Sequence, residues 1–419
     1  MRFSSLEQWL EWQESLHPSA IDLGLERPGR VLKALGLESP DHTVITVAGT
    51  NGKGSSVAML ESILLAAGYR VGCYTSPHLL HYNERIRLNG EPVADSAICE
   101  AFERIDRARG ETSLTYFEFG TLAAFDLFAR AGLDVALLEV GLGGRLDAVN
   151  LLDADVALVT AIDIDHAAWL GEDREAIGRE KAGIFRRGRP AVCSDPQPPA
   201  SLLAHAAELG CELSLPGRDF AYRQEEGDSW SWSGPRRYSA LPLPALRGRF
   251  QLQNAAGVLM VLSLLAERLP VSPQHLRQGL LAVALPGRFQ RLPGEPALIV
   301  DVAHNPQSAA ALAENLRQMP VAGQTRAVVA MLADKDLARV VRELVPVVDH
   351  WYVAGLDVWR GCDAASLAAV VAAESAAAPA VHEQLPQALA QAQQEAGPGD
   401  RIVVFGSFHT VAAALAAHL

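Results

Sequence analysis

Short apolar runs alternate along the chain with longer segments that have helical spacing. The runs Asp134–Val140 and Asp155–Ile162 are apolar almost throughout, which is typical of parallel strands buried on both faces. A third run, Val44–Ala48, ends in a glycine-rich turn, and an Ala/Leu-rich segment from Ser56 to Ala67 follows with helical spacing. Strands that alternate with helices in this way predict an α/β fold with a mostly parallel sheet.

Two regions differ from this pattern. Residues 190–250 are rich in Pro, Gly and Trp, and we expect short antiparallel strands there. After Leu285–Phe289 the alternation restarts with a strand at Ala297–Val302. We therefore predict a first domain over residues 1–287 and a smaller, doubly wound, Rossmann-like domain over residues 288–419. Other segments with helical spacing are 6–16, 95–109, 115–131, 253–269, 306–318 and 386–396.

Composition limits the class of protein. At 419 residues, with 49% hydrophobic and 20% charged residues, the chain resembles a soluble protein of two domains. Its net charge of −13 argues against a general nucleic-acid or membrane surface, so an anionic ligand needs a local basic site. The five cysteines show no paired spacing and are expected to be reduced. We see no signal peptide or membrane-spanning run and expect a cytoplasmic protein.

The glycine-rich turn after Val44–Ala48 has the layout of a phosphate-binding loop. Backbone N–H groups and the N-terminus of the following helix attract phosphate oxygens, a lysine adds a full positive charge, and a hydroxyl can reach Mg²⁺. The spacing departs from the common P-loop, because Gly54 separates Lys53 from Ser55. An ordinary turn with a solvated lysine is the alternative. The predicted ATP-binding residues are Gly49, Thr50, Asn51, Gly52, Lys53, Gly54 and Ser55.

Polar residues at the ends of the neighbouring strands are candidate metal ligands. Glu139 ends an apolar strand, where a carboxylate is costly to bury unless it is paired or metal-bound; a partly exposed acid is the alternative. His166 follows Asp163 and Asp165, and it is either a ligand or a core histidine bonded to the backbone. Ser76 could bind metal or form a turn. Lys181, taken alone, is interpreted as an exposed helix lysine.

The second domain has a similar group at the end of its first strand. Asp301 can accept hydrogen bonds from ribose hydroxyls, and the His304 imidazole can lie against a nucleotide. Asn305 before Pro306 is also a good helix N-cap, and both interpretations can hold together.

The motifs, taken in order, resemble one family. They are G-T-N-G-K-G-S, S-P-H-L, E-R-I, F-E-x-x-T, E-V-G-L-G-G-R-L-D-A-x-N, D-H-x-x-W-L-G, R-E-K-A-G-I, Q-N-A-A, P-G-R and D-x-A-H-N-P. The chain is similar to the folate-adding branch of the Mur ligase superfamily, the bifunctional dihydrofolate synthases/folylpolyglutamate synthases. The resemblance runs from about residue 20 to 306, with a compatible α/β tail. The I-D-L-G-L-E-R stretch at 21–27 resembles forms that use dihydropteroate.

The resemblance implies roles for individual residues. Ser76 and Glu139 would bind one Mg²⁺, and His166 a second, with Lys181 carbamylated beside them. Lys53, Lys181 and His304 would be catalytic. Asn254, Arg288 and Asp301 would join the loop in binding ATP. The substrate-binding residues would be Asp22, Leu23, Gly24, Thr115, Tyr116, Phe117, Glu118, Leu146, Asp147 and Ala148. ATP, two Mg²⁺ ions and, as a candidate, K⁺ would be the cofactors.

The resemblance also implies a reaction. L-Glutamate would be added to dihydropteroate and to reduced folates through an acyl phosphate, by a monomer without nucleic-acid or membrane partners. The first domain would bind ATP and pterin, and the second would be a glutamate ligase domain. A monofunctional folylpolyglutamate synthase, another Mur-type amino-acid ligase and a non-catalytic nucleotide-binding regulator are the alternatives.

Overall fold

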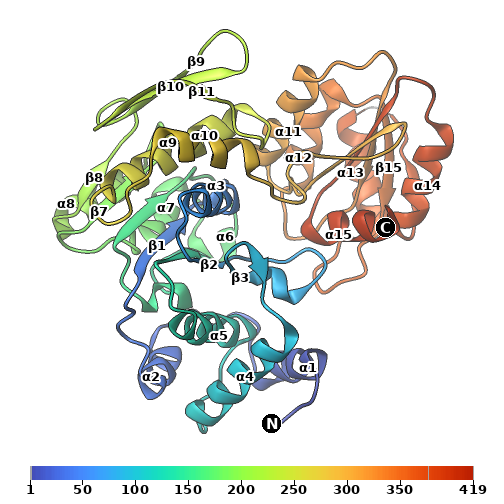
Figure 1. Cartoon of the computed structure of the whole chain (residues 1–419). Helices are drawn as coiled ribbons and strands as arrows, with labels where there is room; N and C mark the ends of the chain where they lie inside the picture. Colours follow the sequence, from blue (N-terminus) through green and yellow to red (C-terminus); the bar gives the residue numbers. More distant parts are fainter. Residues whose placement is uncertain (1, 376, 419) are drawn as a thin grey trace. The chain divides into compact units, whose positions relative to one another are not determined.

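The computed structural model describes residues 2–375 and 377–418, which form two compact units. Unit 1 comprises Met1–Ala245 and Gln251–Ala284, and unit 2 comprises Leu246–Phe250 and Leu285–Leu419 (Figure 1). The domain division predicted at residue 287 falls close to this boundary, but the contribution of Leu246–Phe250 to unit 2 was not expected. No helix in the described part of the chain is both long and apolar enough to cross a bilayer.

The core of unit 1 is an eight-stranded sheet in the order β4-β3-β2-β5-β1-β6-β7-β8. The central strands β1 (Thr43–Ala48), β5 (Val135–Glu139) and β6 (Val156–Val159) are parallel and buried, as predicted. The edge strands β3 and β4 pair antiparallel. The remaining strands are β2 (Val71–Tyr74), β3 (Ile86–Leu88), β4 (Glu91–Pro92), β7 (Pro190–Cys193) and β8 (Glu212–Ser214).

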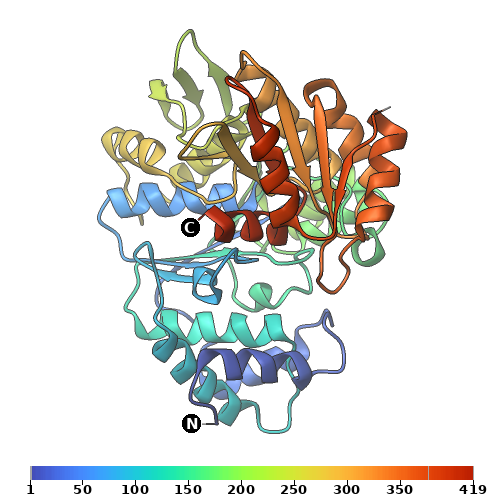
Figure 2. The same ribbon diagram turned by 90° about the vertical axis from the view of Figure 1, so that its right-hand side faces the viewer.

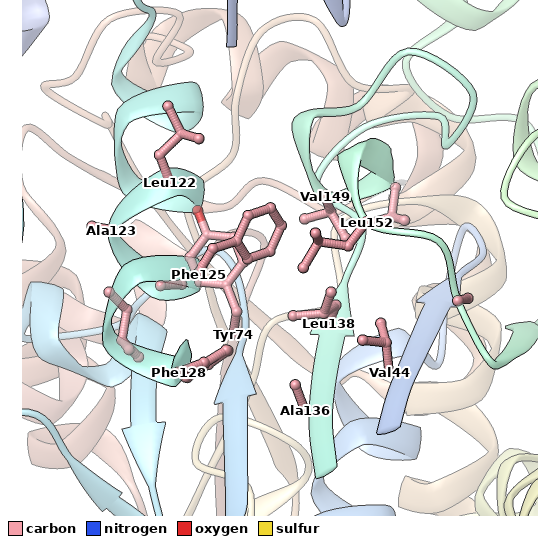
Figure 3. Packing of buried hydrophobic residues seen from close by; sticks show 14 of the residues in the cluster. Val44, Tyr74, Leu122, Ala123, Phe125, Phe128, Ala136, Leu138, Val149 and Leu152 are labelled. Carbon is pink, nitrogen blue, oxygen red and sulfur yellow. The ribbon is translucent and has the colours of Figure 1, made fainter. Parts of the chain in front are cut away.

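Helices cover both faces of this sheet. Figures 1 and 2 show α3 (Lys53–Ala66) on one side and α5 (Tyr116–Arg130) on the other. Figure 3 shows why α5 packs there, since Phe125 points from the helix toward the strand that carries Leu138. The Phe128 ring lies over Gly72 of β2, where an added Cβ would come within 2.9 Å of it. This burial of large apolar side chains is the main stabilising contribution at that face. The other helices of this unit are α1 (Leu6–Leu16), α2 (Glu26–Leu35), α4 (Asp95–Arg109), α6 (Ala167–Leu170), α7 (Arg174–Ala182), α8 (Ala200–Leu209) and α10 (Pro273–Ala282).

The hard-to-interpret region 190–250 contains two kinds of strand. β9 (Ala221–Gln224), β10 (Ser229–Ser233) and β11 (Arg237–Pro242) form a separate antiparallel sheet, as expected. The expectation is wrong for β7 and β8, which are parallel strands of the main sheet. Their connection contains α8, which is the helical crossover that a parallel pair requires.

Unit 2 is a doubly wound domain, as predicted. Its six-stranded sheet has the order β12-β13-β17-β14-β15-β16. Helices α11, α12 and α13 pack on one face, while α14 and α15 contact strands of the same sheet from the other. The strands are β12 (Gln290–Leu292), β13 (Ala297–Asp301), β14 (Thr325–Val329), β15 (His350–Ala354), β16 (Ala380–His382) and β17 (Arg401–Phe405). The helices are α11 (Pro306–Gln318), α12 (Leu337–Leu344), α13 (Ala364–Ser375), α14 (Leu385–Glu395) and α15 (Phe408–His418).

One long helix, α9, runs from Arg249 to Leu264. The sequence predicted a helix over 253–269, so the helix begins four residues earlier and ends five residues earlier than expected. The earlier start adds a turn before Gln253, and this turn contributes to the site described below.

Candidate active site

The glycine-rich turn is fixed against the end of strand β6. Thr50 donates its backbone N–H to the Ala161 oxygen at 2.7 Å, and the Thr160 hydroxyl donates to the Asn51 oxygen at 2.8 Å. Gly52, with φ of 95°, is the N-cap of α3, so the helix begins at Lys53 rather than at the expected Ser56. The first N–H groups of a helix have no partner within it. The turn therefore presents these donors and the positive end of the helix dipole at one place.

Lys53 folds back over this turn. Its Nζ donates to the backbone oxygens of Gly49 at 3.0 Å and Thr50 at 3.2 Å. Its charge also lowers the pKa values of Asp147 and Lys181. The ammonium group is thus held at the helix N-terminus, within electrostatic reach of two other predicted site residues.

Helix α9 closes one side of the turn. A Cβ on Gly52 would lie 2.4 Å from Asn254 Oδ1, so only glycine allows this approach without a shift of Asn254. Asn254 Nδ2 donates to Gln251 Oε1 at 3.0 Å, and Gln251 Nε2 donates to the Ser55 hydroxyl at 3.3 Å. Asn254 was predicted to belong to this site. Gln251 was missed, although it precedes Asn254 by three positions and so shares its helix face.

Glu139 and Ser76 lie side by side. Glu139 pairs in register with Val47 just before the turn, and its side chain is buried. The Ser76 backbone N–H donates to Glu139 Oε2 at 3.3 Å. The alternative of a partly exposed strand-end acid is therefore wrong. A buried carboxylate beside a hydroxyl provides the oxygen ligands that Mg²⁺ prefers.

Lys181 on α7 is buried, with 3% of its surface exposed, so its interpretation as an exposed helix lysine is wrong. Its pKa is lowered from 10.5 to about 7, chiefly by burial and also by the positive charge of Lys53, while the charges of Asp165 and Asp147 oppose the shift. His166 follows Asp165 and donates its backbone N–H to Asp165 Oδ1 at 2.8 Å. The structure thus groups Lys53, Lys181, Asp147 and Asp165 electrostatically.

No group of three or more His, Cys, Asp or Glu side chains in the described residues could hold a metal ion by themselves. Mg²⁺ in nucleotide sites is commonly held by one or two protein groups together with phosphate oxygens and water. The pair of Glu139 and Ser76 fits this kind of site, and it does not fit a cage made by the protein alone.

Two of the three predicted substrate segments are in contact. Arg27 forms an ion pair with Asp22 and donates to Glu118 Oε1 at 2.9 Å. Glu118 also accepts from the backbone N–H of Thr115 at 2.8 Å, within a capping box at the start of α5. Leu23 and Gly24 lie in the same segment as Asp22, directly before α2.

The third segment meets the second through Phe117. A Cβ on Gly141 would lie 2.6 Å from the Phe117 ring and 3.3 Å from Asp147 Oδ2. Asp147 accepts hydrogen bonds from the backbone N–H groups of Leu142 and Val149. Leu146 and Ala148, the other two residues of this predicted segment, directly precede and follow it. Burial raises the pKa of Asp147 to about 6, although these N–H groups and Lys53 oppose the shift.

In unit 2, the predicted nucleotide residues also form a group. Asp301 accepts from the backbone N–H groups of Phe289 and Ala303, both at 2.8 Å, and burial raises its pKa while Arg288 opposes the shift. The Arg288 guanidinium lies 5.1 Å from the centre of the Phe408 ring, and the His304 ring lies 6.5 Å from it. The sequence did not predict Phe408.

Asn305 caps helix α11 as expected, since its side chain accepts from the Ser308 N–H at 2.9 Å. His304 Nδ1 lies 2.7 Å from the Val302 oxygen, which fixes the orientation of its ring. The cap and the candidate nucleotide site therefore share one strand end.

Comparison with known proteins identifies the family. The Mur ligase middle domain matches residues 47–262, and the Mur ligase glutamate ligase domain matches residues 287–408. A dihydrofolate synthase/folylpolyglutamate synthase of Escherichia coli K12 is 46% identical over 98% of this chain and 94% of its own. One of Haemophilus influenzae is 41% identical over 98% and 96%. The chain belongs to the dihydrofolate synthase/folylpolyglutamate synthase family.

Solved structures agree with this assignment. An E. coli structure in complex with DHPP and ADP has a TM-score of 0.94 at 45% identity and covers 99% of this chain and 98% of its own. A bifunctional folylpolyglutamate synthase/dihydrofolate synthase with Mn, AMPPNP and L-glutamate bound has a TM-score of 0.92 at 48% identity, over 99% and 98%. The resemblance found in the sequence and the α/β fold class are thereby confirmed. The chain is an ATP-dependent ligase of this family, and not the non-catalytic regulator.

Proposed function

We propose that this chain adds L-glutamate both to dihydropteroate, forming dihydrofolate, and to reduced folates, forming folylpolyglutamates. The observation that supports this most directly is 46% identity along 98% of the chain to a relative whose name includes both activities. The contacts between the segments around Asp22, Thr115 and Asp147 support a single pterin site beside the phosphate loop.

In the proposed reaction, the carboxylate of the acceptor attacks the γ-phosphorus of ATP, and ADP leaves with the electrons of the broken P–O bond. The amine of glutamate then attacks the acyl carbon, phosphate leaves, and the amine loses a proton to give the amide. Residues Gly49–Ser55 bind the phosphates, and Lys53 stabilises the charge that develops on their oxygens.

Ser76 and Glu139 would hold one Mg²⁺, and His166 with a carbamylated Lys181 would hold a second. Bound Mg²⁺ neutralises charge on phosphate oxygens. A lysine with a pKa of about 7 is partly neutral at physiological pH, and only the neutral amine reacts with CO₂. The neutral amine and CO₂ form an N–C bond and release one proton, so an uncharged amine becomes an anionic carbamate. K⁺ is a candidate additional cation.

In unit 2, we assign Asp301 to the ribose hydroxyls, Arg288 to the nucleotide and His304 to positioning of glutamate or phosphate. Their shared strand end, β13, is the usual ligand-binding edge of a doubly wound sheet. We further propose that the protein acts as a monomer in the cytoplasm.

One assay tests the function. The protein is incubated with ATP, Mg²⁺, labelled glutamate and either dihydropteroate or tetrahydrofolate, and the products are identified by mass. We expect one added glutamate on dihydropteroate, one or more on tetrahydrofolate, and ADP release only when acceptor and glutamate are both present. Product from tetrahydrofolate alone would indicate a monofunctional folylpolyglutamate synthase. Product from neither, or rapid ATP hydrolysis without acceptor, would contradict the assignment.

A further inference from the structure

Arg85 differs from the arginines around it because no carboxylate pairs with it. Arg87 pairs with Glu61 at 2.7 Å, and Arg27 pairs with Glu118 at 2.9 Å. Across the described part of unit 1, no Asp or Glu oxygen lies within ion-pair distance of the Arg85 guanidinium. A partly buried cation without a counter-ion is costly unless a ligand supplies one.

Aromatic rings hold the Arg85 guanidinium in place. Its carbon lies 5.5 Å from the centre of the Tyr82 ring and 5.6 Å from that of Tyr116, and its Nε donates to His78 Nδ1 at 2.8 Å. The tyrosine rings thus lie near the planar guanidinium, and His78 contacts its Nε edge. The edge formed by Nη1 and Nη2 makes no hydrogen bond to the described residues. This edge can donate two parallel hydrogen bonds to one carboxylate.

The location connects Arg85 with the proposed reaction. Its backbone oxygen accepts from Thr75 N–H at 2.9 Å, directly before Ser76, whose N–H contacts Glu139. Tyr116 belongs to the predicted substrate segment at the start of α5. The guanidinium is therefore placed between the loop that would hold the activated carboxylate and the segment that would hold the pterin.

Two carboxylates near this cluster influence the pKa values of its tyrosines. The charge of Glu14 raises the pKa of Tyr116, and the charge of Asp147 raises the pKa of Tyr74. The positive charge of Arg85 opposes these shifts, because it lowers the pKa values of Tyr74, Tyr82 and Tyr116. The cluster therefore contains a positive centre that no adjacent acid neutralises through direct contact.

The two acceptors of the proposed function differ at this point. Dihydropteroate has a single carboxylate, which is the group that is activated. A reduced folate ends in glutamate, which has two carboxylates, so one remains ionised after the other is activated. We propose that Arg85 binds this second, unreacting carboxylate and thereby selects folate acceptors. This inference rests on the proposed function and adds a specificity-determining residue to it.

The test measures the ratio of kcat/KM for tetrahydrofolate to kcat/KM for dihydropteroate. In Arg85→Gln we expect this ratio to fall roughly tenfold to hundredfold, chiefly through a higher KM for tetrahydrofolate, as for loss of a charged hydrogen-bonded pair. Arg85→Lys keeps the positive charge but cannot donate two parallel hydrogen bonds to one carboxylate, so it should recover only part of the ratio. The control Arg107→Gln, on an exposed arginine of α4, should leave the ratio unchanged.

A binding measurement separates this role from a structural one. An analogue of tetrahydrofolate that ends in γ-aminobutyrate keeps the γ-carboxylate and lacks the second carboxylate. In the presence of ADP, we expect the wild type to bind it about tenfold or more weakly than tetrahydrofolate, and Arg85→Gln to bind both alike. An equal preference in both proteins, or an unchanged kinetic ratio, would overturn the inference. A wild type that extends neither acceptor would instead contradict the proposed function.

Discussion

Lys181 illustrates how one residue combines a cost in stability with a chemical use. Its amine is enclosed because the loop after β5 packs on α7, where a Cβ on Gly144 would lie 2.9 Å from the Glu180 oxygen and 3.2 Å from Lys181 Cα. Enclosure and the nearby charge of Lys53 favour the neutral amine. In the proposed carbamylation, the same enclosure that makes the charged lysine costly to bury would keep part of it neutral and able to react with CO₂.

This cost gives the free energy of unfolding a defined pH dependence. The folded-state pKa of Lys181 is about 7, below the ordinary lysine value of 10.5, so the unfolded state binds more protons between these values. The free energy of unfolding therefore rises with pH between about pH 7 and 10.5. Below about pH 7 Lys181 is protonated in both states and adds no further pH dependence. In CO₂-free buffer we expect urea unfolding of wild type to gain about 2 kcal/mol from pH 7 to 8.5, and Lys181→Met to lack this gain.

Carbamylation adds a second expectation to the same measurement. Bicarbonate at pH 8 should stabilise the wild type, because the carbamate forms only in the folded state, and it should not stabilise Lys181→Met. A parallel pH slope in both proteins would show that Lys181 is ordinary in the folded state. An equal response of both to bicarbonate would contradict the carbamate.

At the scale of elements, the unit from β1 to α3 determines the phosphate site. Strand β1 lies between β5 and β6, so the turn after it is bordered by Glu139 on one side and Thr160 on the other. A Cβ on Gly49 would lie 1.8 Å from Thr160 Oγ1, which leaves no room for a side chain. The glycines are thus required by close packing as well as by backbone conformation.

Substitution of Gly52 tests this point. Gly52→Ala places a methyl group against Asn254 at a residue with φ of 95°, so we expect AMPPNP affinity to fall roughly tenfold or more, with about 1–2 kcal/mol lost in stability. Gly68→Ala is a matched control, because Gly68 has φ of 87° and open space around its Cα. It should lose similar stability and keep its affinity for AMPPNP in calorimetric titration. Equal affinities in the two variants would contradict the role of the turn.

At the scale of the molecule, the sequence predicted best where neighbouring strand ends determine the geometry. The family resemblance implied that Glu139 and Ser76 lie together, and they do, because parallel strands bring their carboxyl ends to one edge. The burial of Lys181 was not predictable, because it depends on how the loop after β5 packs on a helix 35 or more residues later. Gln251 and strands β7 and β8 were missed because weak local patterns were decided by packing with distant segments.

Each unit has a hydrophobic core of its own, which predicts separable stability. Leu316 of α11 is fully buried in the core of unit 2, so Leu316→Ala should cost about 2–5 kcal/mol. We expect hydrogen exchange to increase in peptides of α11, β14 and β17, while peptides of α3 and β5 keep their protection, because the core of unit 1 is unchanged. Leu281→Ala, at a residue that is 61% exposed, should change stability by less than about 0.5 kcal/mol. Equal loss of protection in both units would mean that the chain unfolds as one cooperative body, and the two cores would then not be independent.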